Sequence, residues 1–153
     1  MQVDKFELRE TAISYFAELT RILKLELAPI INTVIDEIIK TCNSDAGVKK
    51  QLQEATKDQY ALDSDSEDEA ELVGIDVDVN FIDEKSAAVH ALGNIALFSL
   101  ELLLPRMEEI LNVLQEISFY FHENIRYHVC QTYLQIAIGF LRHLTNTEDK
   151  FHW

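Results

Sequence analysis

The chain has 153 residues, of which 48% are hydrophobic and 26% charged, and its net charge is −14. This composition excludes a largely disordered chain and is sufficient for one domain with a hydrophobic core. The charge argues against nucleic acid as a partner, because phosphate contacts need a basic surface, whereas a basic protein would suit it. With only 4 glycines and 2 prolines, the composition favours helices.

Two helices are predicted in the first part of the chain, and together they form a paired-helix unit at residues 4–43. From Phe6 to Leu23 the apolar residues lie three and four positions apart, which is the spacing of one helix face. A short break follows. Pro29 suits the first turn of a second helix, which continues to Cys42.

Residues 44–82 lose this pattern and are interpreted as an insertion. Residues 46–58 are compatible with a short polar helix, and residues 61–79 have no helical period, which predicts a solvated acidic loop. The densest part of this loop is DSDSEDEAE, in which six of nine residues are acidic: Asp63, Asp65, Glu67, Asp68, Glu69 and Glu71.

The acidic loop does not match a calcium-binding loop. If Asp63 is position 1, then Asp68 stands where an EF-hand needs glycine, and Gly74 stands where it needs a bidentate glutamate. Ser64 and Ser66 are each followed three positions later by a glutamate, which makes them candidate phosphorylation sites. Each phosphate would add about −1.5 to −2 charges, and an unmodified spacer is the alternative.

The helical pattern returns after the insertion. Residues 83–121 predict a second helix pair, with Pro105 at the start of its second helix. Residues 122–144 predict the first helix of a further pair, followed by a loop at residues 145–153. Without a second helix, this last unit would leave Leu134, Ile138 or Leu141 uncovered.

The helix pairs form an internal repeat. When Arg9, Lys85 and Arg126 are aligned, the apolar positions that follow them coincide, and so do Pro29 and Pro105. Lys85 and Arg126 are 41 residues apart, within the period of about 40–47 that is typical of HEAT and armadillo repeats. The predicted fold is therefore an all-α superhelix of the HEAT-repeat type, with about two and a half repeats and an acidic insertion between them.

We find no catalytic, cofactor or metal-binding pattern in the sequence. None of the five histidines follows a glutamate by three positions, as a helical di-metal site would require. His90 and His128 are interpreted as core or interface histidines with a hydrogen bond. Cys42 and Cys130 fit no zinc or redox spacing and are expected to be buried free thiols in a reducing compartment.

No signal peptide precedes the first helix, and no apolar run approaches the roughly 18 residues of a membrane span. An enzyme and a membrane protein are therefore not expected. In solenoids of paired helices, one helix of each pair lines an extended binding surface. The helices that begin with proline are the candidates here, and the predicted partner-binding residues on them are Asp36, Glu37, Glu108, Glu109, Asn112 and Glu116. A merely solvated helix face is the alternative.

Three motifs between residues 82 and 140 resemble the central repeats of importin-beta nuclear transport receptors. They are IDEKSAAVHALGNIAL, which follows directly on the acidic loop, the helix start LPRMEE, and a phenylalanine- and tyrosine-rich helix end that leads into HENIR. Within that family, the branch that imports ribosomal proteins and histones is the most similar.

The resemblance implies recognition of basic nuclear-localisation segments in cargo, with release when the GTPase Ran binds in its GTP form. It also implies nucleoporins as further partners and movement between cytoplasm and nucleus, and it makes the acidic loop an auxiliary charged surface. The alternative function is a general HEAT-repeat scaffold or regulatory subunit of a multiprotein complex.

Overall fold

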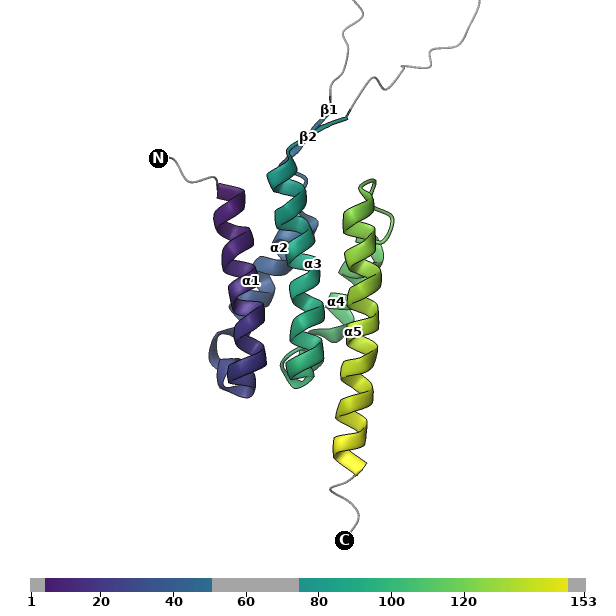
Figure 1. Cartoon of the computed structure of the whole chain (residues 1–153). Coiled ribbons are helices and arrows are strands. Elements are labelled where there is room, and N and C mark those ends of the chain that lie inside the picture. Colours follow the sequence, from purple (N-terminus) through teal and green to yellow (C-terminus); the bar gives the residue numbers. More distant parts are fainter. Residues whose placement is uncertain (1–4, 51–74, 149–153) are drawn as a thin grey trace, which may run out of the picture.

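The computed structural model describes residues 5–50 and 75–148, which are mainly helical (Figure 1). Short 3-10 turns at Lys24–Leu27, Leu100–Leu102 and Leu104–Arg106 connect the members of each helix pair. The α-helices in this part of the chain are α1 (Lys5–Leu23), α2 (Ala28–Asn43), α3 (Val79–Ser99), α4 (Met107–Ile117) and α5 (Glu123–Glu148). The predicted all-α class is confirmed.

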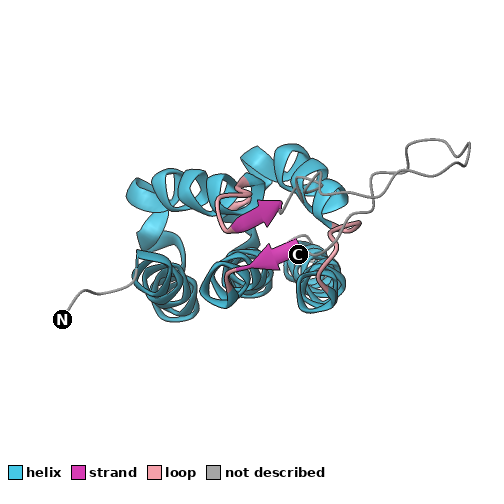
Figure 2. Cartoon of the chain, turned by 90° about the horizontal axis from the view of Figure 1, so that it is seen from above, coloured by secondary structure: helices cyan, strands magenta, loops and turns pink. Residues whose placement is uncertain are grey.

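The helices lie in two layers. α1, α3 and α5 stand side by side in one layer and run in the same direction, while α2 and α4 form the second layer (Figures 1 and 2). The central helix α3 packs against α1 on one flank and α5 on the other, and α2 covers it from the second layer. The chain thus alternates between the layers from one helix to the next.

Small residues let α5 approach α3 closely. A Cβ atom at Gly139 would fall on the backbone carbonyl of Ala96, so only glycine fits at this crossing. Around it, Val129, Thr132 and Ile136 of α5 are buried, and the Thr132 hydroxyl donates to the carbonyl of Val89 at 2.9 Å. This crossing fixes the separation of the two helices.

A buried carboxylate ties three helices together. Glu84, which is almost fully buried in α3, lies 2.9 Å from Nε of Arg9 in α1 and accepts a hydrogen bond from the Thr41 hydroxyl in α2 at 3.2 Å. Burial raises the pKa of Glu84, and Arg9 and Thr41 oppose that shift. Because an unpaired buried charge is costly, these two partners keep the carboxylate compatible with the core.

Lys85 and Arg126, which align in the internal repeat, make equivalent contacts. The Lys85 ammonium donates to the Ser44 carbonyl, just after α2, at 2.6 Å, and lies 4.3 Å from the centre of the Tyr120 ring. Arg126 donates to the carbonyls of Tyr120 and Phe121, just after α4, at 2.7 and 2.8 Å. In both cases a base at the start of one unit satisfies carbonyl groups at the end of the preceding unit.

Two short strands correct the prediction for the insertion. β1 (Val48–Lys50) pairs antiparallel with β2 (Ile75–Val77), so residues 48–50 are not part of the short helix predicted at 46–58. The chain turns into β1 at Gly47, where a Cβ atom would overlap the Phe81 ring. Residues 46 and 47 form a turn before β1, and β2 replaces part of the loop predicted at 61–79. Residues 51–58 of the predicted helix and the Asp63–Glu71 loop with Ser64 and Ser66 lie outside the described part of the chain.

Two helix boundaries also differ from the prediction. α3 begins at Val79 and not at residue 83, because the Asp78 side chain caps it by accepting from the backbone N–H of Asn80 at 3.0 Å. α5 continues to Glu148, so residues 145–148 of the loop predicted at 145–153 are helical, and the other residues of that loop lie outside the described part of the chain. Near its end, Arg142 donates to the Leu97 carbonyl at 3.4 Å, so α3 still supports this part of α5.

The two cysteines differ in exposure. Cys42 is buried as predicted, and its burial raises the pKa of the thiol to about 12. Cys130 is exposed, contrary to the prediction, because it lies on the side of α5 opposite to the buried Val129 and Thr132. Helical spacing in the sequence could not distinguish this outer side from a buried one.

Among the described residues, no single helix has both the length and the apolar content to cross a membrane. In this part of the chain, one pair of segments, Val79–Leu102 and Leu104–Ile117, has the required length and apolar content when taken together, but the pair is bent by 112°.

Candidate interaction surfaces

The first candidate surface is a groove on the second layer, between α2 and α4, which we call the acidic groove. Its volume is about 490 Å³. Four of the six predicted partner-binding residues line it: Glu108, Glu109, Asn112 and Glu116. The other lining residues are Ile39, Asn43, Pro105, Arg106 and Val113.

The remaining two predicted residues lie differently. Asp36 reaches the acidic groove only through an ion pair, with Oδ1 2.6 Å from Nη1 of Arg106. Glu37 lies on another face of α2, where it pairs with Lys40 at 3.3 Å and lines a separate pocket. The groove therefore brings together the four predicted residues of α4, whereas the two predicted residues of α2 do not line it.

Arg106 also lines the acidic groove and is not among the residues predicted from the sequence. Its Nε donates to Oε2 of Glu109 at 2.8 Å, and its Nη1 donates to Asp36 and to the Asn32 carbonyl. The hydrogen bonds that Arg106 donates, first to Glu109 and then to Asp36, raise its pKa, while burial opposes the shift. The guanidinium thus balances the carboxylates of Glu109 and Asp36 at this groove.

The carboxylates of Glu108 and Glu116 make no ion pair with any described residue. Together with Asn112 they are spaced four residues apart on one exposed face of α4, so the three side chains form a row. Such a row can receive positively charged side chains and supply an amide for hydrogen bonding to a backbone. The sequence shows that Arg106 directly follows the proline that begins this helix, but not that it pairs with Asp36, 70 residues earlier in the chain.

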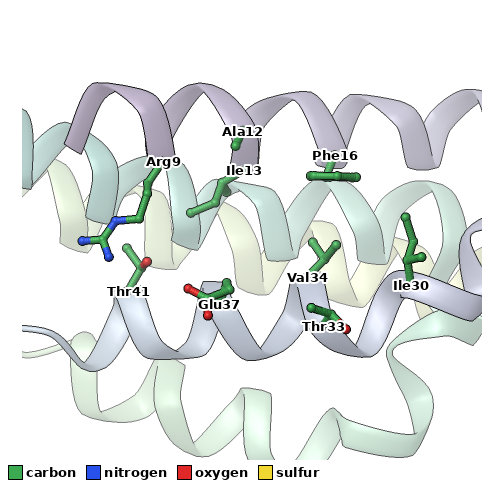
Figure 3. A pocket seen from close by; sticks show the side chains of 9 residues that line it. All are labelled: Arg9, Ala12, Ile13, Phe16, Ile30, Thr33, Val34, Glu37 and Thr41. Atoms are coloured by element: carbon green, nitrogen blue, oxygen red, sulfur yellow. The ribbon is translucent and has the colours of Figure 1, made fainter. Parts of the chain in front are cut away.

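The second candidate surface is an apolar groove between α1 and α2, with a volume of about 360 Å³. Figure 3 shows its two walls facing each other, with Phe16 opposite Val34, and Ile30 at the same end. Its other lining residues are Arg9, Ala12, Ile13, Thr33, Glu37 and Thr41. The sequence places apolar residues of α1 on one helix face, but whether such a face is covered depends on what lies beside it.

A third, smaller pocket of about 280 Å³ lies among α1, α3 and α5. The rings of His90 and His128 are 5.6 Å apart there, beside Glu10 and Asp83. Burial, followed by His128, lowers the pKa of His90, while Glu18 opposes the shift. Both histidines lie at a helix interface, as predicted, but Nδ1 of His128 has no hydrogen-bond partner among the residues described.

Within residues 5–50 and 75–148, no three His, Cys, Asp or Glu side chains are placed to hold a metal ion. The features that remain are two grooves of different chemistry, one lined by carboxylates and one apolar. Comparison of the sequence with protein-family models and with curated proteins finds no match.

Proposed function

We propose that this chain is a segment of a nuclear transport receptor of the importin-beta type. On this proposal its helix pairs are HEAT-type repeats of a solenoid, and its acidic groove binds Lys- and Arg-rich localisation segments of cargo such as ribosomal proteins and histones. Binding of Ran in its GTP form releases the cargo. The observation that carries the proposal is the row of Glu108, Asn112 and Glu116 along α4.

Repeated contacts support the solenoid part of the proposal. The two-layer alternation of helices places α1 with α2 and α3 with α4 as successive units, with α5 beginning a third. Lys85 and Arg126 bind carbonyl groups at the end of the preceding unit in the same way. Units that contact only their neighbours through repeated interactions are the defining property of solenoids.

The chemistry of the acidic groove supports a basic partner. Glu108 and Glu116 offer two carboxylates that form no ion pair with the described residues, and charge-assisted hydrogen bonds from Lys or Arg are stronger than neutral ones. The net charge of −14 would also steer a cation toward the chain. Arg106 lowers the number of available carboxylates, so a basic segment competes with it for Asp36 and Glu109.

The experiment is a titration of the chain with a Lys/Arg-rich histone-tail peptide at low and high salt. We expect salt-sensitive binding, and a loss of about tenfold in affinity, or about 1.4 kcal/mol, for the double variant Glu108→Gln with Glu116→Gln. Arg106→Gln is expected to strengthen binding, because it releases two carboxylates. Glu26→Gln, an exposed acidic residue outside the groove, is the control for charge alone. An affinity that changes neither with salt nor with any of the three groove substitutions would contradict the proposal.

The same complex allows a test of release. Addition of Ran loaded with a non-hydrolysable GTP analogue to the chain–peptide complex is expected to displace the peptide, whereas the GDP form is not. The Asp63–Glu71 loop is proposed as an auxiliary charged surface for the same basic partners, and the proposed location is shuttling between cytoplasm and nucleus.

Exposed aromatic side chains favour the second candidate function, a HEAT-type scaffold. Phe119 and Phe121 in the turn between α4 and α5 are both exposed, and aromatic residues are enriched at protein interfaces. A scaffold would bind its partner through such ridges. A partner whose affinity depends on Phe119 but not on the salt concentration would favour the scaffold function over the transport function.

A further inference from the structure

The apolar groove between α1 and α2 has a counterpart in the second helix pair. In the alignment of the internal repeat, Ile13, Phe16 and Val34 correspond to Val89, Leu92 and Ile110, respectively. In the second pair all three residues are 0% exposed. In the first pair, Phe16 and Val34 are only partly buried and line an open groove.

The difference arises because α2 covers the second pair. α2 packs on both α3 and α4, and its Ile35 and Ile38 are 0% exposed. At the edges of this contact, Thr41 donates to Glu84 of α3, and Asp36 pairs with Arg106 at the start of α4. An amphipathic helix therefore closes the groove between α3 and α4.

We propose that the groove between α1 and α2 binds an amphipathic helix of a partner polypeptide, in the way that the groove between α3 and α4 receives α2. The interface continues an established one, because both grooves are formed by equivalent positions of successive helix pairs. No described residue fills the groove, and about 360 Å³ remains open between Phe16, Ile30 and Val34. Burial of aliphatic side chains there is favourable by about 25 cal/mol for each Å².

The polar residues of the groove specify a charge on this helix. Glu37 and Thr41 of α2 stand at the positions where α4 has the buried Val113 and Ile117. Among the described residues, Glu37 forms an ion pair only with Lys40, at 3.3 Å and at an exposed site. Such surface ion pairs are weak and exchange readily. The bound helix therefore carries aliphatic residues at helical spacing and a Lys or Arg that faces Glu37. The inference rests on the helix-stacking part of the proposed function and not on its cargo.

The probe is a stapled 16-residue peptide with the sequence of residues 28–43, in which Asp36 and Glu37 are replaced by lysine. Stapling holds the helix in place and reduces the entropic cost of binding. We expect saturable binding to the full chain, with methyl chemical-shift changes at Ala12, Ile13 and Val34. Val34→Asp is expected to weaken binding at least tenfold, whereas Leu134→Asp is not, although it places the same charge on the exposed apolar side of α5.

Glu37→Gln is expected to lower the affinity for the lysine peptide several-fold and to leave the affinity for the unmodified α2 peptide unchanged. Glu37→Lys should reverse which of the two peptides binds more tightly. A circular dichroism melt of each variant confirms that it is folded. Absence of binding, or equal effects of Val34→Asp and Leu134→Asp, would overturn the proposal. Self-association of the chain that Val34→Asp abolishes would assign the groove to a second copy and overturn the partner helix.

The histone-tail peptide serves as the independent reference. If it binds Val34→Asp normally while the helix peptide does not, two separate sites are present. If the histone-tail peptide fails to bind at all while the helix peptide behaves as expected, the transport function is wrong and the helix site stands.

Discussion

The two helix pairs have the same apolar spacing but very different burial. α3 has thirteen buried residues in 21, including the charged Glu84 and Lys85, whereas α1 has three in 19. The reason is position, because α3 lies between α1 and α5 while α1 has a neighbour on one flank only. Periodicity in a sequence identifies the face that can be buried, and the place of the helix in the stack decides whether it is.

The second helices of the two pairs, α2 and α4, also differ in which of their equivalent residues are buried. Ile35 of α2 is 0% exposed, while Leu111, the equivalent residue of α4, is 37% exposed. On the opposite side, Val113 of α4 is buried and Glu37 of α2 is exposed. α2 and α4 thus each bury the side that faces the other helix. Of the two sides that face away, the one on α2 carries the polar Glu37 and the one on α4 carries the apolar Leu111.

The pair Ile35 and Leu111 provides the largest expected difference. Ile35→Ala removes a fully buried side chain and should lower the free energy of unfolding by about 2–5 kcal/mol. Leu111→Ala should cost about 1 kcal/mol or less, because the side chain already contacts water. Chemical denaturation of both variants measures the difference. Equal losses would mean that position in the stack does not control burial.

Two glycines at the contact between α3 and α5 differ in what an added methyl group would meet. In an unobstructed helix, Gly→Ala is stabilising by about 0.5–1 kcal/mol, but a Cβ at Gly139 falls on the Ala96 carbonyl. Gly139→Ala should therefore lower the free energy of unfolding by about 1–3 kcal/mol.

Gly93→Ala is the matched control. Its Cβ would meet mainly the end of the Gln135 side chain, which can move aside, so a smaller loss is expected in the same denaturation experiment. A Gly139→Ala variant more stable than the parent chain would show that α5 does not pack against α3 at this distance.

The helices and their pairing could be predicted from the sequence, because apolar spacing and the two prolines are local signals. The residues of α4 in the acidic groove could be predicted for the same reason. The strands at 48–50 and 75–77 could not, because each is three residues long and exists only through pairing across the insertion. Arg106 as a balancing charge and the exposure of Cys130 depend on contacts between distant residues, which one sequence does not display.

The smallest expected effect concerns the flank between α3 and α5, where His90 faces His128 at 5.6 Å. Burial and His128 lower the pKa of His90 below its ordinary value of 6.5, so the unfolded chain binds this proton more readily than the folded chain. His90 therefore contributes stability above pH 6.5 that is lost as the pH falls through its lowered pKa. His90→Gln should flatten the fall in the free energy of unfolding between about pH 7 and 5. A slope of the same steepness in His90→Gln would mean that this interface does not distinguish the two protonation states of His90.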